Sequence, residues 1–238
     1  MKLHLLGVNG PFPESRSATS GYLLEAGGSL LQFDMGSGVL GVLTALSAPE
    51  SLTALFISHW HFDHAADVPV LMYRLQALDC ILPVYGPADP DAPLFRLVSS
   101  VPCFAFHEIS AGSVLTVGRA EIRIRSARHP VPAVGFTVSM GESIFGYTGD
   151  TNTLPTLADE YRGCDLLLAD GLFPRDMWAE NKPHLSAKLA AELAAEAGVS
   201  RLVVTHLNPL YPRRLLLNEA RAVFPETLLA ESGAVFNL

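Results

Sequence analysis

The segment Ser58-His59-Trp60-His61-Phe62-Asp63-His64 places three histidines and one aspartate within six positions. It follows the apolar stretch Thr53–Ile57, which has the length of a buried strand, and it leads into a helical pattern. In an extended chain, side chains two positions apart point to the same side, so His59 and His61 are expected to face one point. A turn directs Asp63 and His64 toward a second point. Because imidazoles and carboxylates clustered at a strand end are typical of metal sites, the segment predicts a loop that serves two ions.

Length and composition are those of a globular α/β protein. Of the 238 residues, 49% are hydrophobic and 17% charged, which is enough apolar material for one core, and we expect a single domain over residues 1–238. No apolar run approaches the roughly 18–20 residues of a membrane span. The N-terminal Lys2–Val8 lacks the features of a secretory signal. Cys80, Cys103 and Cys164 form no CxxC pair, so we expect neither a disulfide framework nor a thiolate zinc site, and a cytoplasmic location.

The charge distribution argues against an extended nucleic-acid surface. With 24 acidic against 16 basic residues, the net charge is −8, the wrong sign for phosphate neutralisation over a whole face. Arg123 and Arg125 alternate with Ile122 and Ile124, the ordinary pattern of a strand with one solvated face. Any contact with a polyanion is therefore expected to be local.

Strand-like and helical segments alternate without an intervening linker. The predicted helices cover Asp67–Ala77, Pro93–Ser99, Leu154–Tyr161, Ala187–Ala197 and Pro212–Val223. The predicted strands cover Leu3–Val8, Tyr22–Glu25, Leu30–Phe33, Ala54–Ser58, Ile81–Tyr85, Val101–Ile109, Ile122–Ser126, Gly135–Ser139, Ile144–Tyr147, Leu166–Ala169, Leu202–Thr205, Thr227–Leu229 and Ala234–Phe236. Ser186 as an N-cap and Gly198 just past the end mark one helix clearly. The absence of GxGxxG and GxxxxGK[ST] patterns argues against Rossmann and P-loop nucleotide folds.

The HxHxDH pattern of residues 59–64 resembles the signature of the metallo-β-lactamase superfamily. Four further segments resemble other motifs of that superfamily, in the same order: Asp34–Gly38, His129, Gly149–Thr151 and Thr205–His206. The segments Ala18–Leu24, His184–Ala187 and Arg201–Leu207 are similar to the ribonuclease Z-like branch, particularly to its short bacterial members without a tRNA-binding arm. The resemblance implies an α/β fold, a four-layer αββα sandwich of two mixed β-sheets with the site at one edge.

The resemblance also implies a dinuclear metal centre. His59, His61 and His129 would bind the first ion, Asp63, His64 and His206 the second, and Asp150 would bridge both. Nitrogen and carboxylate ligands without thiolate favour two Zn²⁺, with Mn²⁺ or Fe²⁺ as alternatives. Such a pair lowers the pKa of a shared water and so supplies a metal-bridging hydroxide for hydrolysis.

Several other polar residues receive roles from the resemblance. His184 corresponds to a branch histidine beside the scissile phosphate, and with Asp63 it is the expected catalytic residue; a loop histidine bound to a carbonyl is its structural alternative. Asp34 is expected to orient a ligand histidine or to form a turn. Asp170 stands where the branch often has Glu, and its role stays open. His4 and His107 lie in predicted strands and are not expected to be ligands.

We therefore expect a phosphodiesterase that acts on a small phosphodiester or nucleotide. Only 20 residues separate His129 from Asp150, and a predicted hairpin fills them, which leaves no room for a tRNA-binding arm and disfavours tRNA 3′-end processing. Arg128, Arg213 and Arg214 are possible phosphate contacts. The main alternative is hydrolysis of a carboxylic ester, lactone or thioester at the same site. A non-catalytic metal-binding module is a further alternative, and homodimers are common in the branch.

Overall fold

Two mixed β-sheets lie face to face in the computed structural model, which describes residues 1–238. One sheet has the order β14-β1-β2-β3-β4-β5-β6, and the other has the order β13-β12-β11-β10-β9-β8-β7. The first is built from β1 (Lys2–Gly7), β2 (Gly21–Ala26), β3 (Ser29–Phe33), β4 (Ala54–Phe56), β5 (Leu82–Gly86), β6 (Phe104–Glu108) and β14 (Val235–Asn237). The second is built from β7 (Val114–Val117), β8 (Ala120–Ser126), β9 (Val134–Met140), β10 (Ser143–Tyr147), β11 (Leu166–Asp170), β12 (Leu202–Thr205) and β13 (Leu228–Leu229).

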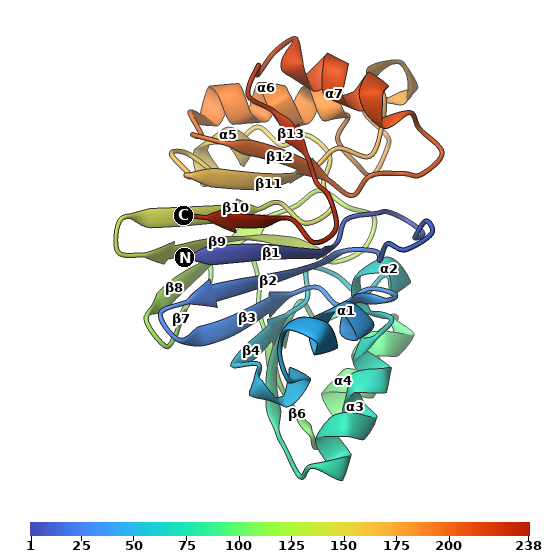
Figure 1. Cartoon of the computed structure of the whole chain (residues 1–238), viewed down its shortest axis with the longest axis vertical. Helices are drawn as coiled ribbons and strands as arrows, with labels where there is room; N and C mark the ends of the chain where they lie inside the picture. Colours follow the sequence, from blue (N-terminus) through green and yellow to red (C-terminus); the bar gives the residue numbers. More distant parts are fainter.

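Helices cover the outer face of each sheet (Figure 1). The first sheet packs against α1 (Val39–Leu46), α3 (Val68–Ala77) and α4 (Pro93–Ser100), and the short α2 (Phe62–Ala65) precedes α3. The second sheet packs against α5 (Leu157–Glu160), α6 (Ala187–Ala197) and α7 (Arg213–Arg221). None of these helices has the length and apolar character that a membrane crossing requires.

Three apolar clusters hold the four layers together. One lies between the sheets and the other two lie beneath the two sets of helices. In the middle cluster, the rings of Phe33 and Phe56 stack with centroids 5.1 Å apart, and Phe136 from the opposite sheet meets Phe33 edge-on at 5.2 Å. Because β11 and β12 are covered on both faces, every residue in them is buried, as expected of parallel strands between two layers.

The predicted αββα sandwich is confirmed, and most of its elements fall where the sequence pattern places them. Helix α6 has the predicted bounds, with the Ser186 hydroxyl accepting from Leu189 N and Gly198 in the left-handed region. The hairpin between His129 and Asp150 is present as β9 and β10. Ile122 and Ile124 face the core, whereas Arg123 is exposed.

Two predictions of secondary structure were wrong in part, and two elements were missed. The predicted strand from Val101 begins only at β6, because α4 continues to Ser100 and a turn follows. The predicted helix from Leu154 forms only as the single turn of α5. Helix α1 and strand β7 were missed: α1 starts after Gly38 in the left-handed region and lacks a side-chain cap, and β7 is a mostly exposed edge strand.

The polar residues singled out in the sequence follow the ends of strands along one edge of the sandwich. Asp34 follows β3, Ser58–His61 follows β4, Asp150 follows β10, and His206 follows β12. Within each sheet the relevant neighbours are parallel, so their carboxyl ends meet at the same edge. Side chains distant in the sequence are therefore brought together where the two sheets meet.

Candidate metal centre

The histidine-rich segment runs from β4 to α2 in an extended conformation. His61 is the N-cap of α2 and has extended backbone angles, φ −65° and ψ 152°. His59 and His61 therefore project to the same side, and His59 Nε2 lies 2.9 Å from His61 Nδ1. The helix then turns Asp63 and His64 toward a different point, as the spacing predicts.

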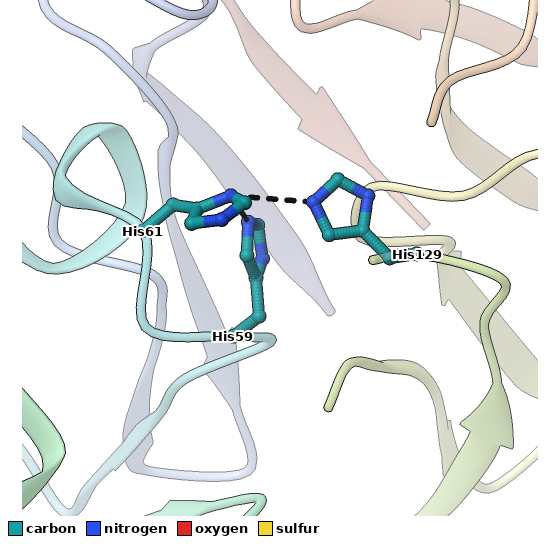
Figure 2. A group of neighbouring side chains, drawn as sticks. All are labelled: His59, His61 and His129. Atoms are coloured by element: carbon teal, nitrogen blue, oxygen red, sulfur yellow. Dashed lines mark hydrogen bonds between the residues drawn. The ribbon is translucent and has the colours of Figure 1, made fainter. Parts of the chain in front are cut away.

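His59, His61 and His129 form the first group of converging side chains (Figure 2). His129 comes from the loop after β8, and its Nε2 lies 3.2 Å from His61 Nδ1. Four ligands at about 2.0–2.1 Å from a zinc ion stand about 3.3 Å apart in a tetrahedron. The two distances from His61 Nδ1 thus agree, within a few tenths of an ångström, with those between ligands of one ion, and the ligand atoms of the three residues lie within 4.8 Å of one another.

Asp63, His64, Asp150 and His206 form the second group. Asp150 Oδ2 lies 3.1 Å from His64 Nε2, and Asp150 Oδ1 lies 3.3 Å from His206 Nδ1. The Asp63 carboxylate is 3.7 Å from both His64 Nε2 and His206 Nε2. Asp150 Oδ2 is also 3.6 Å from His59 Nε2, so this carboxylate stands between the two groups.

The protonation states of most of these residues suit cation binding. His64 differs: although burial opposes the charged ring, Asp150, Asp34 and Asp63 raise its pKa well above the usual value, so a cation must displace its proton. Burial lowers the pKa of His129 to about 4, and it lowers the pKa of His59 and His206 as well, so these rings are neutral. Burial would raise the pKa of Asp150, but the neighbouring His206 and His64 hold that pKa well below its usual range. Neutral imidazole and ionised carboxylate are the forms that bind metal. The buried His206 Nε2 has no hydrogen-bond partner, and coordination of a cation would use its lone pair. The donor set therefore fits a pair of divalent ions.

Two glycines permit the close packing of this site. A Cβ atom on Gly10 would lie 2.1 Å from Cε1 of His206, and one on Gly36 would lie 2.0 Å from the carbonyl oxygen of Asp63. Gly36 belongs to a segment singled out in the sequence. Gly10 was missed, and its only signal was its position in a turn-forming Asn-Gly-Pro sequence.

Asp34 orients ligand residues from behind the site. It is fully buried, and its carboxylate accepts from Ser58 N at 2.7 Å, Ser58 Oγ at 2.8 Å and His64 Nδ1 at 2.8 Å. The hydroxyl of Tyr147, on the opposite sheet, donates to Asp34 Oδ2 at 2.6 Å. Asp34 is thus an orienting residue rather than only a turn former. Tyr147 was missed because nothing in the sequence connects it with Asp34.

His184 joins the site from the loop before α6. It lies with His129 and Asp150 in a third group, and its Nδ1 donates to Asp170 Oδ2 at 2.9 Å. Asp170 is held in turn by Thr151 N at 3.1 Å. Although burial opposes the charged ring, Asp170 and Asp150 raise the pKa of His184 to about 9. Asp170, whose role the sequence left open, therefore fixes His184.

Asn152 holds the segment that leads to His184. Its side-chain amide donates to the carbonyls of Lys182 at 2.6 Å and Glu180 at 3.3 Å, and its Oδ1 accepts from Trp178 Nε1 at 3.1 Å. The side chain is buried, two positions after Asp150. One short stretch of chain thus carries both a candidate ligand and the support of the His184 loop, which the sequence did not reveal.

The two histidines not expected to be ligands have other partners. Two of the three arginines considered as phosphate contacts are also bonded within the protein. His4 pairs with Glu25 at 2.6 Å, and His107 stacks on Tyr85. Arg128 donates to the carbonyls of Glu180 and Thr153. Arg213 donates to Asn9 Oδ1 at 3.0 Å and to Glu14 at 2.6 Å. Arg128 and Arg213 therefore hold loops of the protein.

The two sheets with paired His/Asp groups at their common edge define the metallo-β-lactamase fold class. The chain belongs to the family described as Beta-lactamase superfamily domain, whose model matches residues 22–207. It is 31% identical to the probable metallo-hydrolase YhfI of Bacillus subtilis over 99% of each chain. The crystal structure of YhfI superposes with a TM-score of 0.93 and covers 99% of each chain.

Two further relatives are ribonucleases of the same fold. The chain is 26% identical to a ribonuclease Z of Methanosarcina mazei, over 97% of this chain and 96% of the relative. The short form of human tRNase Z superposes with a TM-score of 0.81 at 20% identity and covers 100% of this chain and 99% of that one. Together with the two candidate metal-binding groups, the family assignment supports a metal-dependent hydrolase.

Proposed function

We propose that this protein is a dinuclear metal-dependent phosphodiesterase that acts on a small phosphodiester or nucleotide. The observation that carries the proposal is the His184–Asp170 pair beside Asp150. A histidine held by a carboxylate next to a metal centre suits a reaction in which a leaving oxygen must be protonated. The name of the ribonuclease Z relative supports the same bond type, since a ribonuclease cleaves phosphodiesters.

In this proposal His59, His61 and His129 hold one ion, Asp63, His64 and His206 hold the other, and Asp150 contacts both. Two bound Zn²⁺, or Mn²⁺ or Fe²⁺ in their place, would lower the pKa of a water and stabilise charge on the phosphoryl oxygens. Asp34 keeps the His64 ring in the tautomer with its proton on Nδ1, which leaves Nε2 free as a ligand.

His184 and Asp63 are the proposed catalytic residues. Because Asp170 accepts from His184 Nδ1, the other ring nitrogen, Nε2, is available to give a proton to the leaving oxygen. The Asp63 carboxylate lies 3.7 Å from both His64 Nε2 and His206 Nε2, so it faces the point where the attacking water would lie and is the proposed acceptor of its proton. Thr151 N and Leu172 N hold Asp170 in place, so the proton donor is fixed by the end of β11.

We propose a small substrate rather than a folded RNA. The β9–β10 hairpin occupies the connection between His129 and Asp150, and the net charge of −8 disfavours a long polyanion. We place the reaction in the cytoplasm, because all three cysteines are free, as expected in a reducing compartment.

A carboxylic ester, lactone or thioester is the second candidate substrate. The observation that favours it is a cavity beside His61 whose lining includes no arginine or lysine. An uncharged acyl group, unlike a phosphate, needs no cationic side chain and could bind in such a cavity. The same ligand set would serve that reaction, so the distinction must come from assays.

The test is a direct ranking of substrates. Purified protein is loaded with zinc or manganese and assayed with bis(p-nitrophenyl) phosphate, a lactone and a thioester. We expect the highest kcat/KM for the phosphodiester, and a loss of that activity after chelation. Hydrolysis of the lactone or thioester alone would contradict the proposal and select the second candidate.

A further inference from the structure

A cavity of about 330 Å³ opens beside the first group of histidines. Its lining comes from three segments: residues 60–62 after β4, residues 89 and 91–93 at the start of α4, and residues 130–132 directly after His129. The volume lies in the range of small-molecule sites, about 300–1,000 Å³. Because His61 itself is part of the wall, a substrate group bound in this cavity would lie close to the candidate metal centre.

The walls are mostly apolar and partly aromatic. Phe62 is 65% exposed, which leaves an aromatic face without a protein partner at the mouth of the site. Trp60 is buried, and its Nε1 already donates to Pro87 O at 2.7 Å, so the indole offers only its ring surface. Pro130, Val131 and Pro132 supply apolar surface from a second segment. These surfaces suit a flat, uncharged ring.

The charged groups in the lining are acidic. Asp89 and Asp91 are present, and no arginine or lysine is. Asp89 is only 7% exposed, its Oδ1 accepts from Asp91 N at 3.3 Å, and no cation is paired with it. A carboxylate has acceptor capacity beyond one long hydrogen bond, so Asp89 can accept from a further donor. Asp89 therefore offers an acceptor for an N–H donor in the cavity and disfavours a phosphate there.

We propose that this cavity binds the nucleobase of the substrate, with the ring against the Phe62, Trp60 and proline surfaces and an exocyclic amino group donating to Asp89. This inference rests on the proposed function, since it places a nucleotide's phosphodiester at the metal centre. The cavity then selects bases that carry an amino group. It also rejects substrates with a second phosphate on that side.

Binding can be measured without turnover. Zinc-loaded protein is titrated with adenosine and with purine riboside, which lacks the amino group, by isothermal titration calorimetry. We expect adenosine to bind about tenfold more tightly or better, the size of a hydrogen bond to a charged acceptor. In Asp89→Asn this preference shrinks, because the amide oxygen still accepts but carries no charge, whereas Glu142→Gln, an acidic-to-amide change in the β9–β10 turn, leaves it unchanged.

A second variant tests the cavity independently of Asp89. Ala92→Leu narrows the cavity and is expected to weaken both nucleosides severalfold, even if Asp89→Asn fails to fold. Equal affinity of the wild type for both nucleosides, or unchanged binding in Ala92→Leu, would overturn the proposal. Hydrolysis of bis(p-nitrophenyl) phosphate without adenosine binding would contradict the nucleobase site but not the proposed phosphodiesterase function. Adenosine binding without hydrolysis of any phosphodiester would contradict the proposed phosphodiesterase function but not the binding of a base in the cavity.

Discussion

The two groups of candidate ligands differ in how firmly the protein holds them. In the second group, His64 and His206 are fully buried or nearly so, and the Asp34, Ser58 and Tyr147 network lies directly behind His64. In the first group, His59 is fully buried, but His61 and the half-buried His129 lie on loops, and the one protein partner of His129 Nδ1 is the carbonyl of Pro183 at 3.2 Å. The difference indicates a firm second site and a more exchangeable first site.

The largest effect is expected from removing the residue that the two groups share. Asp150→Ala should lose both ions and all measurable turnover, because Asp150 is within 3.6 Å of nitrogens from each group. Metal content is measured by inductively coupled plasma mass spectrometry, and circular dichroism checks that the fold remains. Metal content equal to that of the wild type would refute the shared role of Asp150.

Loss of His184 should separate catalysis from metal binding. His184→Ala is expected to keep both ions and to lower kcat by about 10²–10⁴-fold, the usual contribution of a general acid. The loss should be smaller for a p-nitrophenyl leaving group than for an alkyl alcohol, since the first leaves without a proton. An equal loss for both leaving groups would argue that His184 only shapes the site.

Selective metal removal tests whether the two groups hold their ions with different strength. Under a chelator we expect one ion to leave before the other, and His129→Ala should retain only the slowly released ion. Native mass spectrometry over time follows the two species. Simultaneous release of both ions from the wild type would show that the support behind His64 does not make the second site firmer.

A smaller effect is expected at Tyr147, which reinforces the second group from the opposite sheet. Tyr147→Phe removes only the hydroxyl that donates to Asp34, and metal affinity should fall by about tenfold, the lower end of the range for such supporting residues. Tyr161→Phe is the matched control, because its hydroxyl is equally buried and donates to the Tyr147 carbonyl at 3.1 Å. Equal metal affinity in both variants would contradict the role of the Tyr147 hydroxyl.

Local signals predict the histidine-rich loop and the buried strands, and the resemblance supplies the four-layer fold and the assignment of His129, Asp150 and His206. His59, His61, Asp63 and His64 form one contiguous pattern, and the parallel strands β11 and β12 are continuous apolar runs. All seven predicted ligand residues fall into the first two groups. Their assignment as ligands stays a prediction until an ion is observed.

The supporting residues could not be predicted, because their roles depend on contacts between distant segments. Tyr147 reads as an ordinary core tyrosine until the opposite sheet brings Asp34 to its hydroxyl. In the sequence Asn152 resembles an ordinary loop residue, because its contacts with segment 178–183 exist only in the folded chain. Helix α1 was missed for a different reason, since its start is set by the backbone at Gly38 and not by a capping side chain.

The contact between Gly10 and the ring of His206 gives this enzyme an unusual point of vulnerability. A single added methyl group there would collide with the imidazole and displace it, although no predicted ligand residue would be substituted. Gly10→Ala would therefore be an informative inert reference protein for work in living cells. Its surface would match that of the active form, and the difference would lie in one carbon atom beside the reaction centre.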